Sequence, residues 1–374
     1  MKNTEKNTGD MDNNHYCVIM AGGNGSRLWP ASTTACPKQF MDIAETGKTS
    51  IRNTYDRFSS IVPKDNILVV TVRKYRDLVL RDIPELKEEN LLLEPYARDT
   101  APCIAYAAYT LFKRNPQATM VMTPADHLID DDEKFREAIV RSIEFVSENN
   151  VLMTLGITPT RPDPNFGYIQ ITGGSAALQK AGAIKVKTFT EKPDVSLAKV
   201  FIASGEFFWN SGIFVWTAET IIREMEKHLP EVTRVFSGWE HAVGTPMEEE
   251  FISRAYTDCV KISIDYGVME KTDKAWLYPA DFGWSDVGTW ESLYGCIGEK
   301  DMNGNIFNTA KILTEDSHDV VVYSSTYDKL VAVKGLENYV VIDTGKALLI
   351  CPKDDKKLKE FTARLSMPGF ENYR

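Results

Sequence analysis

Three glycines within four positions, Gly22, Gly23 and Gly25, directly follow a short apolar run. Glycine lets the backbone turn where a side chain would collide, and it lets amide N–H groups come close to a ligand. Arg27 and Lys38 follow the cluster and supply the positive charge that suits phosphate groups. An ordinary strand-to-helix turn can have the same composition, so the cluster alone predicts a phosphate site and a plain turn equally well.

Acidic residues that could hold a metal ion stand in two later loops. Asp126 follows the apolar residues 120–122, and an aspartate at a strand end facing a phosphate loop is a natural ligand for Mg²⁺. The same residue could instead cap the next helix. Asp281 and Asp286 share a glycine-containing loop, and their spacing does not choose between them. With Lys192, these residues suit phosphoryl or nucleotidyl transfer, in which catalysis consists largely of positioning and charge neutralisation.

Alternating strands and helices are expected to position these loops. We expect strands at 67–72, 91–93, 119–122 and 151–155, and helices at 50–62, 74–83, 100–113 and 133–149. This order is typical of a parallel sheet with helices on both faces, in which ligands collect at the carboxyl ends of the strands. Further on we expect a strand at 207–216 that is interrupted at Asn210, and a helix at 264–270. Pro193 disfavours helical backbone at Lys192, which should therefore be extended.

The sequence pattern changes past residue 300. Short apolar runs there recur roughly every ten residues with Gly, Asn and Asp between them, which predicts a small all-β region. We expect a disordered lead-in at 1–14, a domain at 15–300 and a β-rich domain at 301–374. The fold class is α/β: a Rossmann-like, mixed but mostly parallel sheet flanked by helices, with a small C-terminal all-β appendage. The appendage could mediate dimerisation or cap the larger domain.

The composition restricts the classes of function. The 374 residues are 43% hydrophobic and 26% charged, as in an ordinary soluble globular protein with a substantial core. A net charge of −10 argues against nucleic acid or a membrane surface as a partner. No apolar run approaches the ~18 residues of a membrane span. The six cysteines are scattered without metal-binding spacing, which favours a reducing cytoplasm.

Two further motifs extend the glycine cluster, because the chain reads Leu-Trp-Pro at 28–30 and Pro-Lys-Gln-Phe at 37–40. Together with the glycines they resemble the signature of the sugar-phosphate nucleotidyltransferases, and in particular of the bacterial mannose-1-phosphate guanylyltransferase branch. Other segments resemble that branch in the same order: 94–102, 123–127, 166–168, 189–193, 209–212, 263–271 and 283–289. The resemblance covers residues 15 to 300, and it implies a fold of the nucleotide-diphospho-sugar transferase type.

The resemblance implies an enzyme that converts GTP and α-D-mannose 1-phosphate into GDP-mannose and diphosphate, with Mg²⁺ as the cofactor. We expect direct, in-line attack of the sugar phosphate oxygen on the α-phosphorus of GTP. A covalent intermediate is not needed, because the nucleophile is already an ionised phosphate. The residues expected to carry catalysis are Arg27, Lys38, Asp126, Lys192 and Asp286.

The resemblance also assigns individual roles. Asp126 and Asp286 would share the Mg²⁺ ion, so the resemblance favours Asp286 over Asp281. Arg27 and Lys38 would bind the triphosphate and stabilise the diphosphate leaving group. The nucleotide would be bound by Ala21, Gly22, Gly23, Gly25, Arg27, Lys38, Arg98, Thr100 and Pro102. The sugar phosphate would be held by Lys192, and the sugar by Gly167, Glu191 and Asn210.

Three alternatives remain open. The nearest is a transferase for another nucleoside triphosphate and sugar 1-phosphate, because base choice depends on loop geometry. A regulatory relative that binds a nucleotide sugar without turnover is disfavoured, since the whole catalytic set is present. An oxidoreductase is disfavoured because Arg27 stands where the G-x-G-x-x-G pattern has its last glycine.

One position departs from the family pattern. Thr33 stands where the family often has a basic residue, which leaves more of the phosphate charge to Arg27 and Lys38. Longer relatives carry an isomerase domain after the transferase, and this sequence stops at Arg374, so we expect no isomerase activity. We also expect a homodimer.

Overall fold

The computed structural model describes residues 13–23, 25–44, 46–173, 182–297, 299–326, 328–353, 355 and 357–373. The chain divides into two compact units: residues 1–22, 52–125 and 129–284 form the first, and residues 23–51, 126–128 and 285–374 form the second. Most of the lead-in expected at 1–14 lies outside the described residues. These two units are defined by compactness, whereas the boundary expected at residue 300 is defined by a change in the sequence pattern. That boundary therefore stays a prediction.

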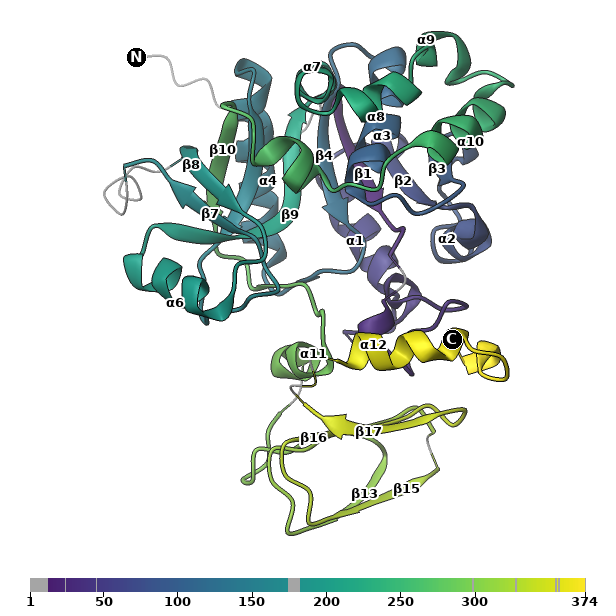
Figure 1. Cartoon of the computed structure of the whole chain (residues 1–374), viewed down its shortest axis with the longest axis vertical. Helices are drawn as coiled ribbons and strands as arrows, with labels where there is room; N and C mark the ends of the chain where they lie inside the picture. The colour runs from purple at the N-terminus through teal and green to yellow at the C-terminus, as the bar shows by residue number, and fades with distance from the viewer. Residues whose placement is uncertain are drawn as a thin grey trace. The chain divides into compact units, whose positions relative to one another are not determined.

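Within the described residues, a nine-stranded sheet forms the centre of the first unit (Figure 1). Its order is β3-β2-β1-β4-β9-β6-β10-β8-β7, and β9 also pairs with β7. The strands are β1 (His15–Met20), β2 (Ile67–Val72), β3 (Leu91–Glu94), β4 (Thr119–Pro124), β6 (Leu152–Ile157), β7 (Tyr168–Ile171), β8 (Ile184–Thr190), β9 (Phe207–Thr217) and β10 (Ala275–Ala280). The run β3-β2-β1-β4 is parallel, whereas β9 is antiparallel to β4 and β6. The expected α/β class with a mixed sheet is therefore confirmed.

Helices pack against this sheet. The longer ones are α1 (Ser50–Phe58), α2 (Arg76–Asp82), α3 (Thr100–Arg114), α4 (Asp132–Glu148), α6 (Val195–Ser204), α7 (Ala218–His228) and α10 (Glu248–Asp258). The shorter ones are α8 (Pro230–Val235), α9 (Trp239–Ala242), the 3₁₀ helices η3 (Lys64–Asn66), η4 (Arg73–Tyr75) and η5 (Glu88–Asn90), and the π-helix η6 (Asp265–Met269). Residues 101–111 of α3 are all buried, because α3 packs against both β3 and the helices α7 to α9. Among the described residues, no helix is both long and apolar enough to span a membrane.

The second unit contains the glycine cluster from Gly23 onward and the C-terminal strands. Its helical segments are η1 (Ser26–Leu28), η2 (Lys38–Phe40), α11 (Trp290–Ile297), α12 (Leu358–Ala363), η7 (Arg364–Ser366) and η8 (Glu371–Tyr373). Its strands are β12 (Ile306–Asn308), β13 (Lys311–Glu315), β14 (Val321–Ser324), β15 (Leu330–Lys334), β16 (Tyr339–Asp343) and β17 (Leu348–Pro352). The short strands β5 (Leu128–Ile129) and β11 (Trp284–Ser285) lie where the chain passes from one unit to the other.

The C-terminal strands coil from β12 to β16, and β16 and β17 then form a hairpin. β12, β14 and β16 pair in parallel in one sheet, and β13 pairs in parallel with β15 in another, so strands two apart in the sequence become neighbours. β17 closes the first of these sheets in an antiparallel pairing with β16. Buried valines, including Val320, Val322 and Val333, form a small core beneath these strands. The expected all-β appendage is confirmed.

A separate apolar cluster joins the glycine-cluster segment to the rest of the second unit. Leu28 and Trp29 pack in the same core as Trp290 and Ile306. The indole N–H of Trp290 donates to the carbonyl oxygen of Trp29 (3.2 Å), and the indole N–H of Trp29 donates to the carbonyl oxygen of Tyr373 (2.7 Å). The segment that carries Arg27 is thus held by α11, the C-terminal strands and the end of the chain.

The structure differs from the sequence-based expectations at three places. β9 does not end at Asn210, but its pairing with β6 shifts register between Asn210 and Phe214, where Gly212 has φ of 70°, so the expected interruption is an irregularity within one strand. The segment expected as a helix at 264–270 is the five-residue π-helix η6. Lys192 is not extended but has φ of 50°, in the left-handed region. Proline disfavours the right-handed helical region for the residue before it. The left-handed backbone of Lys192 avoids that region, as an extended backbone would.

Candidate active site

The glycine cluster makes a tight turn that requires glycine at one position. Gly25 has φ of +56°, and a Cβ there would lie 2.5 Å from Ser32 Oγ and 2.8 Å from Lys38 Cβ. A side chain at Gly23 would meet nothing within 4 Å, and the carbonyl oxygen of Gly23 accepts from Gln39 Nε2 (2.8 Å). Arg27 lies exposed on η1, and within the described part of the chain it has no hydrogen bond or ion pair. Its guanidinium is therefore available to an anionic ligand.

Lys38 is buried, with 6% of its side chain exposed, and it joins two loops of the second unit. Its ammonium Nζ lies 3.0 Å from Asp126 Oδ2. The same ammonium donates to the main-chain carbonyl oxygen of Asp286. The structure thus brings Lys38, Asp126 and Asp286 together, as the resemblance implies for a triphosphate and metal site.

Asp126 is held in its ionised form by its neighbours. Burial alone would raise its pKa, but the charges of Lys38 and His127 and the hydrogen bond from Lys38 hold the pKa of Asp126 below its usual value. About a third of the carboxylate side chain is exposed, at 30%. Asp126 is therefore an anion that a ligand can reach.

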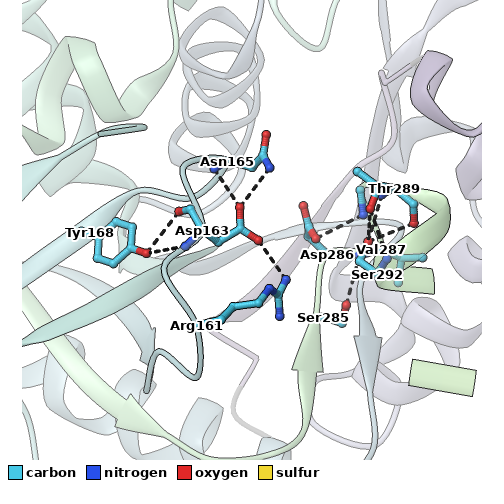
Figure 2. Close-up of polar contacts among 10 residues, drawn as sticks. Arg161, Asp163, Asn165, Tyr168, Ser285, Asp286, Val287, Thr289 and Ser292 are labelled. Carbon is cyan, nitrogen blue, oxygen red and sulfur yellow. Dashed lines mark hydrogen bonds and ion pairs between the residues drawn. The ribbon is translucent and has the colours of Figure 1, made fainter. Parts of the chain in front are cut away.

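Asp286 stands in a turn that its own carboxylate stabilises (Figure 2). Asp286 Oδ1 accepts from the amide N–H of Gly288 (3.2 Å), and Ser285 Oγ accepts from that of Val287 (3.2 Å). A Cβ at Gly288 would lie 2.8 Å from Asp286 Oδ2, so a side chain there would displace the Asp286 carboxylate. Val287 has φ of 46°, an uncommon conformation for a β-branched residue and one that marks a constrained loop.

The two aspartates fit a magnesium ion that also binds substrate. Groups of three or more His, Cys, Asp or Glu side chains do not occur among the described residues, so a closed all-protein cage is not found there. Mg²⁺ is usually bound by one or two carboxylates, and it keeps water and phosphate oxygens as its other ligands. The Asp126 carboxylate and the main-chain carbonyl of Asp286 both contact Lys38 Nζ, so the two residues are neighbours.

Glu94 is a polar residue of the first unit that the sequence analysis did not select. It ends β3, is only 4% exposed and accepts a hydrogen bond at Oε1 from the hydroxyl of Tyr256 (2.9 Å). Burial raises the pKa of Glu94 to about 7, although the Tyr256 hydrogen bond opposes the rise. Its Oε2 lies 3.3 Å from where a Cβ on Gly22 would stand. The sequence signal that could have identified Glu94 is its position at the end of an expected strand, next to an expected nucleotide-binding loop.

The segment around Arg98 is tied to the chain near residue 260. Arg98 Nε donates to the carbonyl oxygen of Tyr256 (3.1 Å), and Thr100 Oγ1 accepts from the amide N–H of Ile264 (2.9 Å). Pro102 is buried in the first turn of α3. The amide N–H of Ala21 donates to Val70 (2.8 Å). The side chains of Arg98, Thr100 and Pro102 are therefore engaged within the fold.

The residues expected to bind the sugar phosphate lie together in the first unit. A Cβ on Gly167 would collide with Glu191 Oε2 and would lie 3.3 Å from Asn210 Cβ. Lys192 Nζ forms an ion pair with Glu191 Oε1, so the two side chains lie side by side. Burial would lower the pKa of Lys192, but the hydrogen bond and charge of Glu191, with the charge of Asp265, raise it.

The loop before Gly167 is built around one carboxylate (Figure 2). Asp163 Oδ1 accepts from both the backbone N–H and the side-chain amide of Asn165 (2.9 Å each), and Oδ2 pairs with Arg161 (2.9 Å). The hydroxyl of Tyr168 accepts from the Asp163 amide N–H (3.0 Å) and lies 3.1 Å from its carbonyl oxygen. This network fixes the backbone that leads to Gly167.

Comparison with known families accounts for most of the chain. A nucleotidyl transferase family model matches residues 16–300, and a MannoseP isomerase/GMP-like beta-helix domain model matches residues 311–365. The first match covers the sheet and the glycine cluster, and the second covers most of the coiled C-terminal strands.

Individual proteins and structures agree with these matches. The alginate biosynthesis protein AlgA of Pseudomonas fluorescens is 36% identical over 358 residues, which cover 94% of this chain and 72% of that protein. A mannose-1-phosphate guanylyltransferase of Escherichia coli is 34% identical over 367 residues, which cover 96% and 75%. A crystal structure described as a mannose-1-phosphate geranyltransferase from Thermus thermophilus is 31% identical, with a TM-score of 0.82, and covers 95% of this chain and 100% of that one.

Proposed function

The chain belongs to the nucleotidyl transferase family, and we propose that within it the chain acts as a mannose-1-phosphate guanylyltransferase. In this reaction GTP and α-D-mannose 1-phosphate give GDP-mannose and diphosphate. An oxygen of the sugar phosphate forms a bond to the α-phosphorus of GTP, and the bond from that phosphorus to the β-bridging oxygen breaks. Diphosphate leaves with the electron pair of that bond.

The observation that carries the proposal is the buried contact of Lys38 with Asp126 and with the backbone of Asp286, beside the glycine cluster. A fixed ammonium and an exposed guanidinium at Arg27 suit the negative charge that develops on a departing diphosphate. Because the chemistry needs only positioning and charge neutralisation, this set of groups is sufficient without a protein nucleophile.

Asp126 and Asp286 would hold Mg²⁺, which we propose as the cofactor. When bound, the ion would supply positive charge to the phosphate oxygens of the substrate. Lys38 orients the Asp126 carboxylate from within the protein, which leaves the exposed part of that carboxylate toward the ligand.

Glu94 supports guanine as the base. Guanine presents two donors on one edge, the N1–H and the N2 amino group, and a carboxylate accepts from both. Glu94 lies beside Gly22 with Oε1 engaged by Tyr256, so Oε2 is the atom placed to accept from a base that stacks near Gly22. Uracil and thymine offer one ring N–H between two carbonyl oxygens, and those oxygens would face a carboxylate without a proton.

The cluster around Gly167 supports a sugar phosphate as the second substrate. Lys192, half exposed at 51%, would hold the phosphate, and Glu191 and Asn210 would bind hydroxyl groups. We also propose a reducing cytoplasm as its location, supported by five described cysteines that are free thiols, and a homodimer, which light scattering would test.

A substrate panel tests the proposal. The purified protein is incubated with Mg²⁺ and each of GTP, ATP, UTP and dTTP, paired with mannose 1-phosphate or glucose 1-phosphate, and diphosphate release is measured. The proposal predicts the highest kcat/KM for GTP with mannose 1-phosphate. A higher kcat/KM for another pair would assign the chain to a different transferase, and no release with any pair would contradict catalysis.

A further inference from the structure

The amide of Asn210 is held by three hydrogen bonds. Its Oδ1 accepts from the hydroxyl of Thr154 (3.2 Å) and from the backbone N–H of Gly212 (3.1 Å). Its Nδ2 donates to Asp265 Oδ1 (2.9 Å). An amide oxygen has two lone pairs and an amide nitrogen has two hydrogens, so this arrangement leaves one N–H of Asn210 for a further partner.

The groups that hold Asn210 come from rigid elements. Thr154 lies on β6, Gly212 lies on β9 and Asp265 begins the π-helix η6. Single-turn π-helices occur frequently at functional sites, where they place a side chain that a regular helix would not. Rotating the amide by half a turn would set Nδ2 against the backbone N–H of Gly212 and Oδ1 against the Asp265 carboxylate. The Thr154 hydroxyl does not decide the orientation, because it also lies 3.3 Å from the carbonyl oxygen of Ile213 and can accept as well as donate. Asp265 therefore forces the remaining position of Asn210 to be a donor.

Glu191 offers the complementary acceptor close by. Its side chain is 8% exposed, and within the described residues its Oε2 is buried without a hydrogen-bond partner. Its other oxygen is engaged by Lys192. A Cβ on Gly167 would touch both Glu191 Oε2 and Asn210 Cβ, so the unpaired oxygen and the Asn210 side chain border the same small space. A buried acceptor without a partner is costly, and a ligand that donates to it removes that cost.

We propose that Asp265 is a positioning residue that holds Asn210 so that its one remaining N–H, together with Glu191 Oε2, recognises a single hydroxyl of the sugar 1-phosphate. The hydroxyl accepts from Asn210 and donates to Glu191. The proposal rests on the proposed function and adds to it a specificity-determining residue that does not itself touch the sugar.

This arrangement selects strongly between sugars. A substrate that lacks the hydroxyl, or presents it in the other configuration, leaves Glu191 Oε2 unpaired. A site built to hydrogen-bond a hydroxyl rejects analogues without it far more strongly than an apolar pocket rejects a changed methylene.

Three variants of the full-length protein test the role of Asp265. Asp265→Ala removes the acceptor and frees the amide to rotate, and it is expected to raise KM for mannose 1-phosphate about 10-fold, the effect of losing roughly one hydrogen bond. KM for GTP and kcat at saturating sugar phosphate should not change. Asp265→Asn keeps a carbonyl oxygen toward Asn210 and should keep KM within about threefold of wild type.

The third variant separates positioning from structural support. In the double variant Asn210→Asp with Asp265→Asn, Thr154 and Gly212 still donate to residue 210, and the amide at residue 265 now donates to it as well. Each internal hydrogen bond and the net charge are kept, but the N–H offered to the sugar is lost. The double variant should melt near the wild-type temperature and still show KM for mannose 1-phosphate raised about 10-fold or more.

Monodeoxy analogues of mannose 1-phosphate complete the test. The wild type should lose at least about 10-fold in kcat/KM with one analogue, and Asp265→Ala should lose much less with that same analogue, because its hydroxyl contact is already weakened. A sugar KM within twofold of wild type in Asp265→Ala, or a wild-type sugar KM in the double variant, would overturn the proposal while leaving the proposed function standing. Absence of turnover in the wild type would contradict the proposed function instead, and this inference with it.

Discussion

Lys38 has an unusual environment for a lysine in a soluble protein, because its ammonium is buried and contacts an aspartate and a main-chain carbonyl. Lysine is seldom buried unless it is paired. Here the pairing connects the glycine-cluster segment with Asp126 and Asp286, which are far apart in the sequence. The candidate active site therefore depends on charge that the fold places inside the protein.

The carboxylates that would hold Mg²⁺ can be tested one at a time. Asp286→Asn should lower kcat by a factor of about 10² to 10³, since it weakens charge stabilisation at the phosphates. It should melt near the wild-type temperature, because the carbonyl that Lys38 contacts is unchanged and the asparagine Oδ1 can still accept from the amide N–H of Gly288. Asp126→Asn should lower kcat similarly and also lower the melting temperature, because it removes the ion-pair partner of Lys38.

Asp281→Asn is the matched control, because Asp281 is exposed and precedes β11, whereas Asp286 follows it. It should leave both kcat and the melting temperature unchanged. Turnover near the wild-type rate in Asp286→Asn, or a loss in Asp281→Asn equal to that in Asp286→Asn, would remove Asp286 from the metal site.

The raised pKa of Glu94 predicts a pH dependence of GTP binding. The folded-state pKa of about 7 lies above the usual value of 4.5, so the carboxylate gains a proton as the pH falls through 7. A protonated carboxyl accepts less well from guanine, and KM for GTP should rise between pH 7.5 and 6. Glu94→Gln should raise KM for GTP about 10- to 100-fold and remove most of this dependence.

Tyr256→Phe provides a second variant at the same carboxyl. It removes the hydrogen bond that lowers the pKa of Glu94, and the midpoint of the KM profile should move to higher pH. Titration of the triphosphate itself is common to all variants, so differences between their profiles report on Glu94. Identical profiles in the wild type and Glu94→Gln would contradict a contact between Glu94 and the base.

At the scale of elements, the turn at Gly25 positions Lys38. Gly25→Ala would place a Cβ 2.8 Å from Lys38 Cβ in a backbone conformation with φ of +56°. The left-handed conformation alone costs roughly 1–2 kcal/mol and the overlap about 1–3 kcal/mol, so stability should fall by about 2–5 kcal/mol. KM for GTP should rise as well, because Lys38 is displaced.

Gly23→Ala is the control for stability, since a Cβ there meets nothing within 4 Å. Thermal or urea unfolding of the two variants measures the difference. Equal stability of the two alanine variants would show that the turn tolerates a side chain at Gly25.

The elements best predicted from the sequence are those with strong periodicity. The expected strands at 67–72 and 91–93 and the helix at 100–113 correspond to β2, β3 and α3 with ends that differ by at most one residue. The helix expected at 50–62 ends at Phe58 as α1, and α8 and α9 were not expected, because helices of one or two turns have too few residues for a period of 3.6 to show. The left-handed backbone of Lys192 follows from its local turn, which the rule for residues before proline does not specify.

At the scale of the whole molecule, the candidate residues form two groups, one within each compact unit. Lys38, Asp126 and Asp286 belong to the second unit, whereas Gly167 and Asn210 belong to the first. Within each unit these residues lie close together, since Lys38 contacts Asp126 and the main chain of Asp286, and a Cβ on Gly167 would lie 3.3 Å from Asn210 Cβ. Their roles in binding and catalysis remain predictions.

Long-range packing was the part that the sequence could not supply. The pattern past residue 300 predicted β-structure, but it did not predict that parallel strands coil, or that Leu28 and Trp29 share a core with Trp290 and Ile306. Glu94 and Asp265 were missed for the same reason, because each is linked to the site by a hydrogen bond to a distant residue. Glu94 accepts from Tyr256 and Asp265 accepts from Asn210, each more than fifty positions away.

The most direct test of the central claim follows the phosphorus atoms of GTP. The protein is incubated with Mg²⁺, mannose 1-phosphate and GTP that carries radioactive phosphorus at either the α or the γ position, and the products are separated. We predict that the α label appears in GDP-mannose and the γ label in diphosphate, in equal amounts. Release of the γ label as inorganic phosphate, or failure of the α label to join the sugar, would contradict nucleotidyl transfer by this protein.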